Sequence, residues 1–168
     1  MLYNVIIQQR WGMKVIFLDI DGVLNSIKFD RLRMRDGRSD FIDESRLPLL
    51  KQIVDSTDAV IVLSTTWRVH WDKDEILCDN FGKYMVDTFA KYGLTIYDKT
   101  PYLGIMAERY NEIKDWLEYA DGVESFVIID DYQYGWGDLQ ANYVKPEPRF
   151  RRGLEDEHVQ KAIEILNK

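Results

Sequence analysis

The stretch Val15–Asn25, with the sequence VIFLDIDGVLN, decides the fold. Four apolar residues are followed at once by Asp19 and Asp21, and Gly22 then allows the backbone to turn. A short apolar run with β-branched and aromatic members is typical of a strand that is covered on both faces, as strands of parallel sheets are. Because carboxylates are costly to bury, we expect them at the carboxyl end of this strand, where open α/β sheets bind their ligands.

Asp19 and Asp21 are two residues apart, so in a regular strand their side chains point to the same face and repel each other. A hard divalent cation with oxygen ligands relieves this repulsion, and magnesium is the usual ion where phosphate is also bound. The alternative is that this pair is only an acidic corner between a strand and a turn.

Composition and charge narrow the class of protein. The chain has 168 residues, so we expect a single domain, over residues 13–168. Because Met13 directly precedes the first strand, residues 1–12 are expected to form an N-terminal extension. A net charge of -7 argues against binding of nucleic acid or anionic membranes through overall charge, although a local basic patch is compatible with it. Cys78 is the only cysteine, which excludes an intrachain disulfide and favours a cytoplasmic protein. No apolar run approaches the roughly 20 residues needed to span a bilayer.

Apolar periodicity predicts that strands and helices alternate after the first strand. The expected strands are residues 59–63, 94–97, 126–129 and 143–144, and the expected helices are 45–55, 67–92 with a break near 78–82, 105–119 and 154–166. This alternation predicts an α/β fold, a Rossmann-like three-layer sandwich with a mainly parallel sheet and right-handed crossovers. Too few residues separate Gly22 from the helix at Ser45 for a large cap domain, so we expect a minimal cap or none.

A basic segment over residues 26–41 interrupts this alternation. It contains four arginines, Arg31, Arg33, Arg35 and Arg38. Its alternating pattern around an Asp-Gly pair at 36–37 predicts a short hairpin, which forms a basic flap beside the acidic strand end. Two interpretations remain open: a solvated surface hairpin, or a flap whose Arg31 and Arg33 contact substrate.

Three of the expected strands end in polar side chains. These are Asp19 and Asp21 after the first strand, Ser64 and Thr65 after the second, and Asp130 and Asp131 after the strand at 126–129. In a parallel sheet the carboxyl ends of the strands lie at one edge. The sequence therefore predicts that these six side chains form one site.

At this point the chain resembles the haloacid-dehalogenase-like (HAD) hydrolase superfamily. The residues that carry the resemblance are DIDGVLN from Asp19, VIVLS ending at Ser64, Arg109 in the following helix, and IIDD ending at Asp131. A narrower likeness, through LSTTWR, ERYNEIKDWL, VIIDD and GLEDE in that order, is to the HAD phosphatase-like domains found alone or attached to RNA-repair proteins. The resemblance covers nearly the whole chain from Met13 onward.

The resemblance implies a role for each catalytic residue. Asp19 is expected to be the nucleophile that forms an aspartyl-phosphate, and Asp21 the acid that protonates the leaving oxygen and then helps to activate water. Ser64 is expected to hydrogen-bond the phosphoryl group. Arg109 is expected to fill the position that is commonly lysine in the superfamily, with Lys114 as the competing candidate.

The resemblance also implies a metal site and a substrate class. Mg²⁺ is expected to be bound by the Asp19 side chain, the main-chain carbonyl of Asp21 and the Asp130 side chain. Asp131 is expected either to bind the ion directly or to contact one of its ligands. Thr65 is the fallback for Ser64, and Arg68 is either a phosphate contact or part of a structural ion pair.

The expected activity is a phosphatase acting on a phosphorylated small molecule or a nucleic-acid end. The open alternatives are phosphoryl transfer to another acceptor and a non-catalytic binding module on the same fold. The sequence indicates no membrane association and no protein partner.

Overall fold

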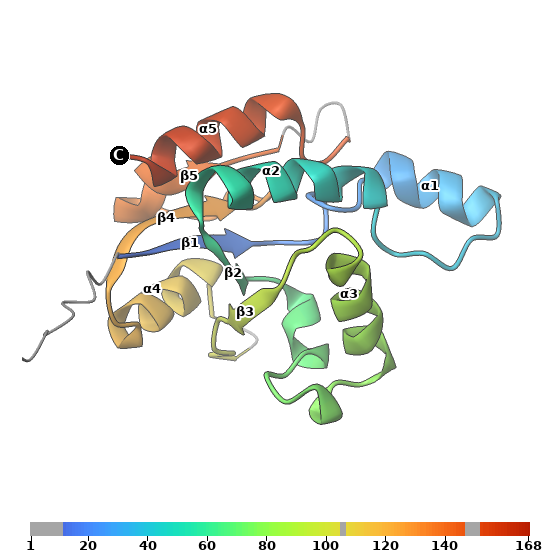
Figure 1. Cartoon of the computed structure of the whole chain (residues 1–168), viewed down its shortest axis with the longest axis horizontal. Helices are drawn as coiled ribbons and strands as arrows, with labels where there is room; N and C mark the ends of the chain where they lie inside the picture. The colour runs from blue at the N-terminus through green and yellow to red at the C-terminus, as the bar shows by residue number, and fades with distance from the viewer. Residues whose placement is uncertain (1–11, 105–106, 147–151) are drawn as a thin grey trace, which may run out of the picture.

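Five parallel strands form a single sheet in the order β3-β2-β1-β4-β5 (Figure 1). The computed structural model describes residues 12–104, 107–146 and 152–168, so all but the last residue of the expected N-terminal extension lies outside the described residues. The strands are β1 (Met13–Leu18), β2 (Val60–Leu63), β3 (Ile96–Lys99), β4 (Val123–Ile129) and β5 (Tyr143–Val144). β1 is central and pairs in parallel with β2 and β4, which brings the ends of these three strands together.

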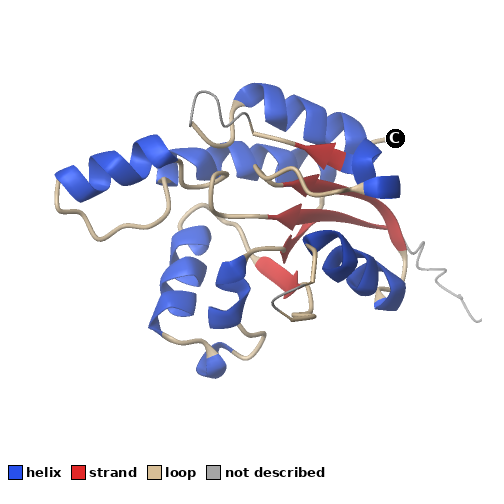
Figure 2. Cartoon of the chain, turned by 180° about the vertical axis from the view of Figure 1, so that it is seen from behind, coloured by secondary structure: helices blue, strands red, loops and turns tan. Residues whose placement is uncertain are grey.

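Helices lie on both faces of the sheet and make the expected three-layer sandwich. The α-helices are α1 (Ile27–Arg35), α2 (Leu47–Thr57), α3 (Asn80–Ala90), α4 (Arg109–Tyr119) and α5 (Asp156–Leu166); the 3-10 helices are η1 (Glu44–Arg46), η2 (Thr66–His70), η3 (Glu75–Leu77) and η4 (Gly137–Asn142). α2 and α5 lie side by side over one face, and α4 covers the other (Figures 1 and 2). The prediction of a Rossmann-like α/β fold is therefore confirmed.

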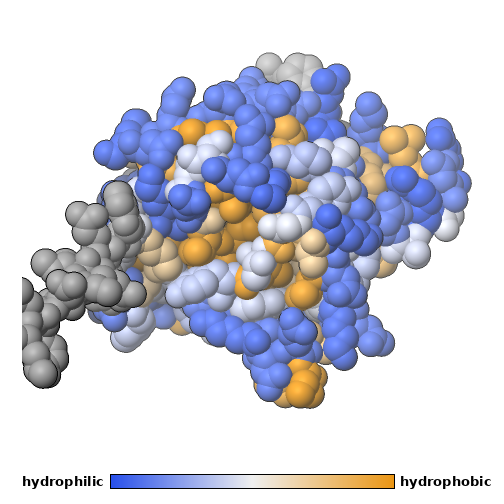
Figure 3. Space-filling model, viewed as in Figure 1, coloured by the Kyte–Doolittle hydropathy of each residue, from blue (hydrophilic) through white to orange (hydrophobic). Residues whose placement is uncertain are grey.

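The central strand supplies both halves of the core. Ile16 and Leu18 pack with apolar side chains of α2, α3 and α5, whereas Val15 and Phe17 pack with those of α4 and η4. All four side chains are completely buried. Burying a side chain of this size contributes roughly 1.5–3 kcal/mol, so β1 is firmly held and its carboxyl end has a fixed position. Figure 3 shows one face of the surface: hydrophilic side chains cover much of it, and apolar side chains gather mainly in its middle.

The helix predicted at 45–55 is present as α2, two residues further along the chain. Pro48 lies in its first turn, where a missing N–H has no cost, and the helix ends at Asp58, whose φ of 56° is left-handed. Leu47, Leu50 and Ile53 form its buried face. β3 also begins two residues later than expected, which is the usual uncertainty of an element boundary.

The prediction of a hairpin over residues 26–41 was wrong, because this segment contains helix α1. Ser26 caps this helix: its side-chain oxygen accepts the N–H of Phe29 at 3.1 Å, and Phe29 is the buried anchor of the helix. Arginine, leucine, methionine and lysine are good helix formers, so helix propensity outweighs the apparent alternation. The turn at Asp36-Gly37 is present, and it ends the helix, with Gly37 at a φ of 66°.

The connections leave the carboxyl edge of the sheet uncovered by a second domain. Within the described residues the insertion between β1 and α2 contains α1 and η1 and no cap domain. The expected helix at 67–92 is divided into η2, η3 and α3. α4 begins at Arg109, after the expected start at 105, and residues 105–106 lie outside the described residues. No helix in the described parts of the chain has the length and apolar character needed to cross a membrane.

Candidate active site

Backbone hydrogen bonds extend the sheet beyond its strands and fix the first residues of the site. The N–H of Asp19 donates to the carbonyl of Ile129 at 2.9 Å, and the N–H of Ser64 donates to the carbonyl of Leu18 at 2.9 Å. Asp130 is tied in the same way to the carbonyl of Val144 at 3.3 Å. The three strand ends predicted to converge therefore do so, and each is held by the neighbouring strand.

Three carboxylates form the acidic centre. Oxygen atoms of Asp19, Asp130 and Asp131 lie within 4.8 Å of one another. Asp19 and Asp130 are buried, and Asp131 is half-buried. Gly22 closes one side of the cluster, because a Cβ at this residue would lie 2.1 Å from Oδ2 of Asp131. These are three of the four residues expected to bind metal.

Burial raises the pKa of all three carboxyl groups, and the charge of Asp19 adds to this effect at Asp130 and Asp131. Burial, and then the charge of Asp19, raise the pKa of Asp130 to about 7. Burial also raises the pKa of Asp19, against the opposing charge of Arg109, and burial followed by the charge of Asp19 raises that of Asp131. A group of acids whose charged forms are unfavourable by themselves becomes favourable around a cation, so the donor set fits a divalent metal ion.

Arg109 is the cation that the chain itself places in this cluster. Its Nη1 atom lies 3.0 Å from Oδ1 of Asp19 and 3.2 Å from Oδ2 of Asp130, and it also donates to the carbonyl of Ser64. Burial lowers the pKa of Arg109, but the charges of Asp19 and Asp130 outweigh this effect and raise it. Arg109 is the first residue of α4, so the helix delivers a buried charge to three strand ends.

Lys114 occupies a different place from Arg109. It lies on the exposed side of α4, and its Nζ atom forms an ion pair of 2.8 Å with Asp138, which also accepts the hydroxyl of Tyr110 at 2.7 Å. The geometry therefore favours Arg109 over Lys114 for the phosphoryl-stabilising role.

The hydroxyl groups after β2 differ in their partners. Thr65 is fully buried, hydrogen-bonds the carboxylate of Asp19 and accepts the N–H of Trp67 at 3.4 Å. Among the described residues, the Oγ atom of Ser64 is buried and has no hydrogen-bond partner. A buried hydroxyl without a partner is costly, so its presence beside the acidic centre points to a ligand that completes it.

The expectation that Asp21 points to the same face as Asp19 assumed a regular strand through both residues. β1 ends at Leu18, so strand parity no longer applies, and the exposed carboxylate of Asp21 accepts from two neutral donors. Nδ2 of Asn25 donates to Oδ1 at 3.0 Å, and Nε1 of Trp67 donates to Oδ2 at 3.0 Å. These contacts hold Asp21 on the solvent side of the acidic centre.

Arg68 forms the structural ion pair that was one of its two expected roles. Its Nη2 atom lies 2.6 Å from Oε1 of Glu112, its Nη1 atom donates to the carbonyl of Thr65 at 2.9 Å, and both side chains are buried. Burial lowers the pKa of Arg68 against the charge of Glu112. The pair connects η2 to α4 one turn after Arg109. A contact between Arg68 and substrate stays a prediction.

The basic flap lies on α1, apart from the acidic centre. Arg33 is paired with Asp30 at 2.8 Å and lies over the ring of Phe41, and Arg31 is exposed. In Figure 1 the helix extends outward from the body of the molecule at the end where the site lies. The structure therefore does not bring Arg31 or Arg33 into contact with the three acids, and their binding to substrate stays a prediction.

Sequence reasoning missed three residues that organise the site. Asn25 holds Asp21, Glu112 neutralises Arg68, and the ring of Tyr134 lies 5.5 Å from the guanidinium carbon of Arg109. The position of Glu112 three residues after Arg109 on a helix was a usable signal, because such residues share a face. No sequence signal marked Tyr134.

An open α/β sheet with an acidic centre after its first and fourth strands, a buried hydroxyl after its second and an arginine at the start of α4 defines a HAD-type hydrolase domain. Residues 15–159 match the family described as the HAD domain in Swiss Army Knife RNA repair proteins, and the chain belongs to this family. Searches of curated proteins and of solved structures found no match. The family supports a phosphatase-type hydrolase in general terms.

Proposed function

We propose that the chain is a magnesium-dependent phosphatase that hydrolyses a phosphomonoester through an aspartyl-phosphate, on a nucleotide or nucleic-acid end. The observation that carries the proposal is the cluster of Asp19, Asp130, Asp131 and Arg109, with the buried hydroxyl of Ser64 beside it, which has no hydrogen-bond partner among the described residues. It combines carboxylates for a cation with a hydroxyl and an arginine for phosphoryl oxygens. Family membership supports the RNA-related substrate class.

The metal-binding residues in this proposal are Asp19, Asp130 and Asp131, with the main-chain carbonyl of Asp21. When bound, Mg²⁺ neutralises the carboxylates and the phosphate and polarises the phosphorus–oxygen bonds. The close approach of Asp131 to Gly22 supports this role, because a larger residue at position 22 would displace the carboxylate.

In the proposed reaction, a carboxylate oxygen of Asp19 attacks phosphorus, and the bond from phosphorus to the leaving oxygen breaks. Asp21 gives its proton to the leaving oxygen, so an alcohol departs. Water then attacks the aspartyl-phosphate and returns its proton to Asp21, which restores Asp19 and releases inorganic phosphate. The exposure of Asp21 supports this assignment, because the alcohol leaves and the water arrives from the solvent side.

Arg109 and Ser64 stabilise the phosphoryl group during both steps. Arg109 already contacts Asp19 and Asp130, so its charge lies where negative charge accumulates. The Oγ–H of Ser64 donates to a phosphoryl oxygen and thereby gains a hydrogen-bond partner, which none of the described residues provides. Thr65 orients Asp19 through its hydroxyl.

Phosphate release with and without Asp19 tests the proposal. Wild-type protein with Mg²⁺ is offered an aryl phosphate, nucleoside monophosphates, sugar phosphates, and 5′- and 3′-phosphorylated oligonucleotides. We expect turnover that chelation of the metal stops, and a loss of at least ~1,000-fold in Asp19→Asn, which keeps the shape but not the nucleophile. Acid quenching during turnover is expected to trap phosphate on the wild-type protein only.

Two outcomes favour the alternatives. Transfer of phosphate to an added alcohol in preference to water indicates a phosphotransferase. Tight binding of phosphorylated oligonucleotides with no turnover of any substrate indicates a binding module on a HAD fold.

A further inference from the structure

Two tyrosines directly follow the acidic residues at the end of β4. Asp130 and Asp131 are followed by Tyr132 and, two residues later, Tyr134. The ring of Tyr134 lies 5.5 Å from the guanidinium carbon of Arg109, the residue that contacts Asp19. The N–H of Tyr132 donates to Oδ1 of Asp130 at 2.8 Å. The ring of Tyr134 and the backbone of Tyr132 therefore border the place where a phosphoryl group would be bound.

The backbone of Tyr132 is fixed on both sides although its side chain is exposed. Its N–H is held by Asp130, and its carbonyl accepts the hydroxyl of Tyr143 at 2.9 Å. The residue is nevertheless 62% exposed. A large aromatic ring that stays in solvent on a fixed backbone is a surface ready for a flat ligand, because little conformational freedom is lost on binding.

The two rings form the outer end of an aromatic series that reaches the core. The ring centroids of Tyr132 and Tyr134 are 4.7 Å apart, and those of Tyr134 and Trp136 are 5.3 Å apart. Trp136 is buried and packs in turn against Tyr143 at 5.0 Å. Tyr132 is therefore supported from below by packed rings, and its position follows that of the acidic centre.

We propose that Tyr132, supported by Tyr134, is a stacking subsite for the nucleobase of the nucleotide whose terminal phosphate Asp19 attacks. This inference rests on the proposed function and adds the residues that bind the base of the substrate. Stacking of a base on an aromatic side chain needs no particular sequence, because every base has a π-face. A phosphatase that acts on ends of varying sequence gains affinity in this way without discriminating between bases.

The test compares two substrates that differ only in the base. One oligonucleotide carries a normal terminal nucleotide bearing the phosphate, and the other carries an abasic residue with the same phosphate. We expect wild type to use the first with a kcat/KM about tenfold higher, within the range measured for base stacking on one aromatic side chain. Both 5′ and 3′ ends are tested.

Variants of Tyr132 assign the difference to its ring. Tyr132→Ala is expected to lower kcat/KM for the base-bearing end by about tenfold and to affect the abasic end far less, whereas Tyr132→Phe keeps the preference. Tyr119→Ala is the matched control, because Tyr119 is 79% exposed in the last turn of α4, about 15 Å along the helix from Arg109. It is expected to leave both substrates unchanged.

Each contrary result is distinguishable. Equal use of both ends by wild type overturns the stacking subsite and leaves the proposed phosphatase intact. An equal loss on both substrates in Tyr132→Ala also overturns it, since it shows a disturbed Asp130 instead. A preference for sugar phosphates that Tyr132→Ala abolishes assigns the ring to a sugar and overturns the nucleobase. No phosphate release from any substrate overturns the proposed function itself.

Discussion

Two regions of this chain contain arginine side chains that use their charge differently: the carboxyl edge of the sheet, and α1 with the turn that follows it. At the carboxyl edge of the sheet, the one guanidinium of Arg109 is buried and reaches side chains or carbonyls of residues 19, 64 and 130, which come from three strand ends. On α1 and the turn that follows, the ion pairs are local: Arg33 with Asp30, Arg35 with Asp36, and Arg38 with Asp40.

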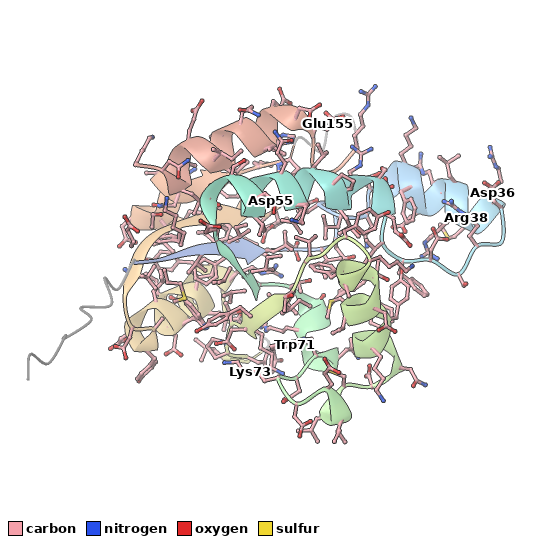
Figure 4. The ribbon with its side chains drawn as sticks, viewed as in Figure 1. Asp36, Arg38, Asp55, Trp71, Lys73 and Glu155 are labelled. Atoms are coloured by element: carbon pink, nitrogen blue, oxygen red, sulfur yellow. The ribbon has the colours of Figure 1, made fainter. Side chains whose placement is uncertain are left out.

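The difference shows that the number of charged residues in a segment does not measure its functional charge. The local pairs on α1 and the turn after it neutralise much of the positive charge of this segment. Ion pairs at the surface contribute little to the stability of the fold. Figure 4 shows Asp36 and Arg38 together at the outer end of this region. A buried arginine among carboxylates retains its field because water does not screen it. We therefore place the chemistry at the sheet edge and a supporting role on α1.

The sharpest test of this comparison removes the central cation. Arg109→Ala is expected to lower kcat by about 100- to 1,000-fold, because a preorganised charge at the phosphoryl group is lost. Lys114→Ala, on the exposed side of the same helix, is expected to change kcat less than twofold, since Lys114 pairs with Asp138. Phosphate release under saturating substrate measures both. A larger loss in Lys114→Ala than in Arg109→Ala would contradict the assignment.

The second test concerns the unpartnered hydroxyl. Ser64→Ala is expected to lower kcat by about 10- to 100-fold while leaving the free energy of unfolding nearly unchanged, because Ser64 Oγ has no hydrogen bond to lose among the described residues. Ser125→Ala is the matched control: Ser125 Oγ donates to the carbonyl of Leu166 at 2.7 Å, so this variant loses about 1 kcal/mol of stability and keeps its activity. Denaturant unfolding and phosphate release are measured on both proteins. Destabilisation without loss of rate in Ser64→Ala would assign Ser64 to packing.

The candidate active site also shows how much could be predicted from the sequence. The convergence of residues 19, 64 and 130 followed from apolar runs that end in polar groups, because a parallel sheet places such ends at one edge. Local capping and tertiary contacts decided the rest. Ser26 caps α1 where the alternating pattern indicated a hairpin, and Trp67 and Asn25 hold the carboxylate of Asp21. Such contacts depend on positions that are distant in sequence or on single hydrogen bonds, and periodicity does not record them.

The third test uses the pH dependence of stability in the metal-free protein. The pKa of Asp130 is raised from 3.8 to about 7 by burial and by the charge of Asp19. The folded state therefore binds this proton more tightly than the unfolded state does. The resulting contribution to the free energy of unfolding is fully present below about pH 4 and is lost as the pH rises through about 7. The advantage of wild type over Asp130→Asn in free energy of unfolding is expected to fall by about 2 kcal/mol between pH 5 and pH 8.

Denaturant unfolding in the presence of a chelator measures this effect at each pH. Asp55→Asn controls for the loss of one negative charge, since Asp55 lies exposed on α2 (Figure 4). Added Mg²⁺ at pH 8 is expected to raise the melting temperature of wild type more than that of Asp130→Asn, because an ion that binds only the folded state stabilises it. Identical pH curves for wild type and Asp130→Asn would remove Asp130 from the acidic centre.

The smallest expected effect is on α1, and it tests the other side of the comparison. We propose that Arg31 and Arg33 contact the phosphate backbone of a nucleic-acid substrate beyond its terminal phosphate. Replacing both by alanine is then expected to raise KM for a phosphorylated oligonucleotide about threefold at low salt and to leave kcat unchanged, because phosphate contacts at the molecular surface are weak and screened by salt. KM for a nucleoside monophosphate, which has no such backbone, is expected to stay the same. Equal losses on both substrates would place these arginines at the reaction centre and contradict the division between the two regions. If neither substrate is affected at any salt concentration, α1 is a solvated helix and substrate recognition belongs to the sheet edge alone.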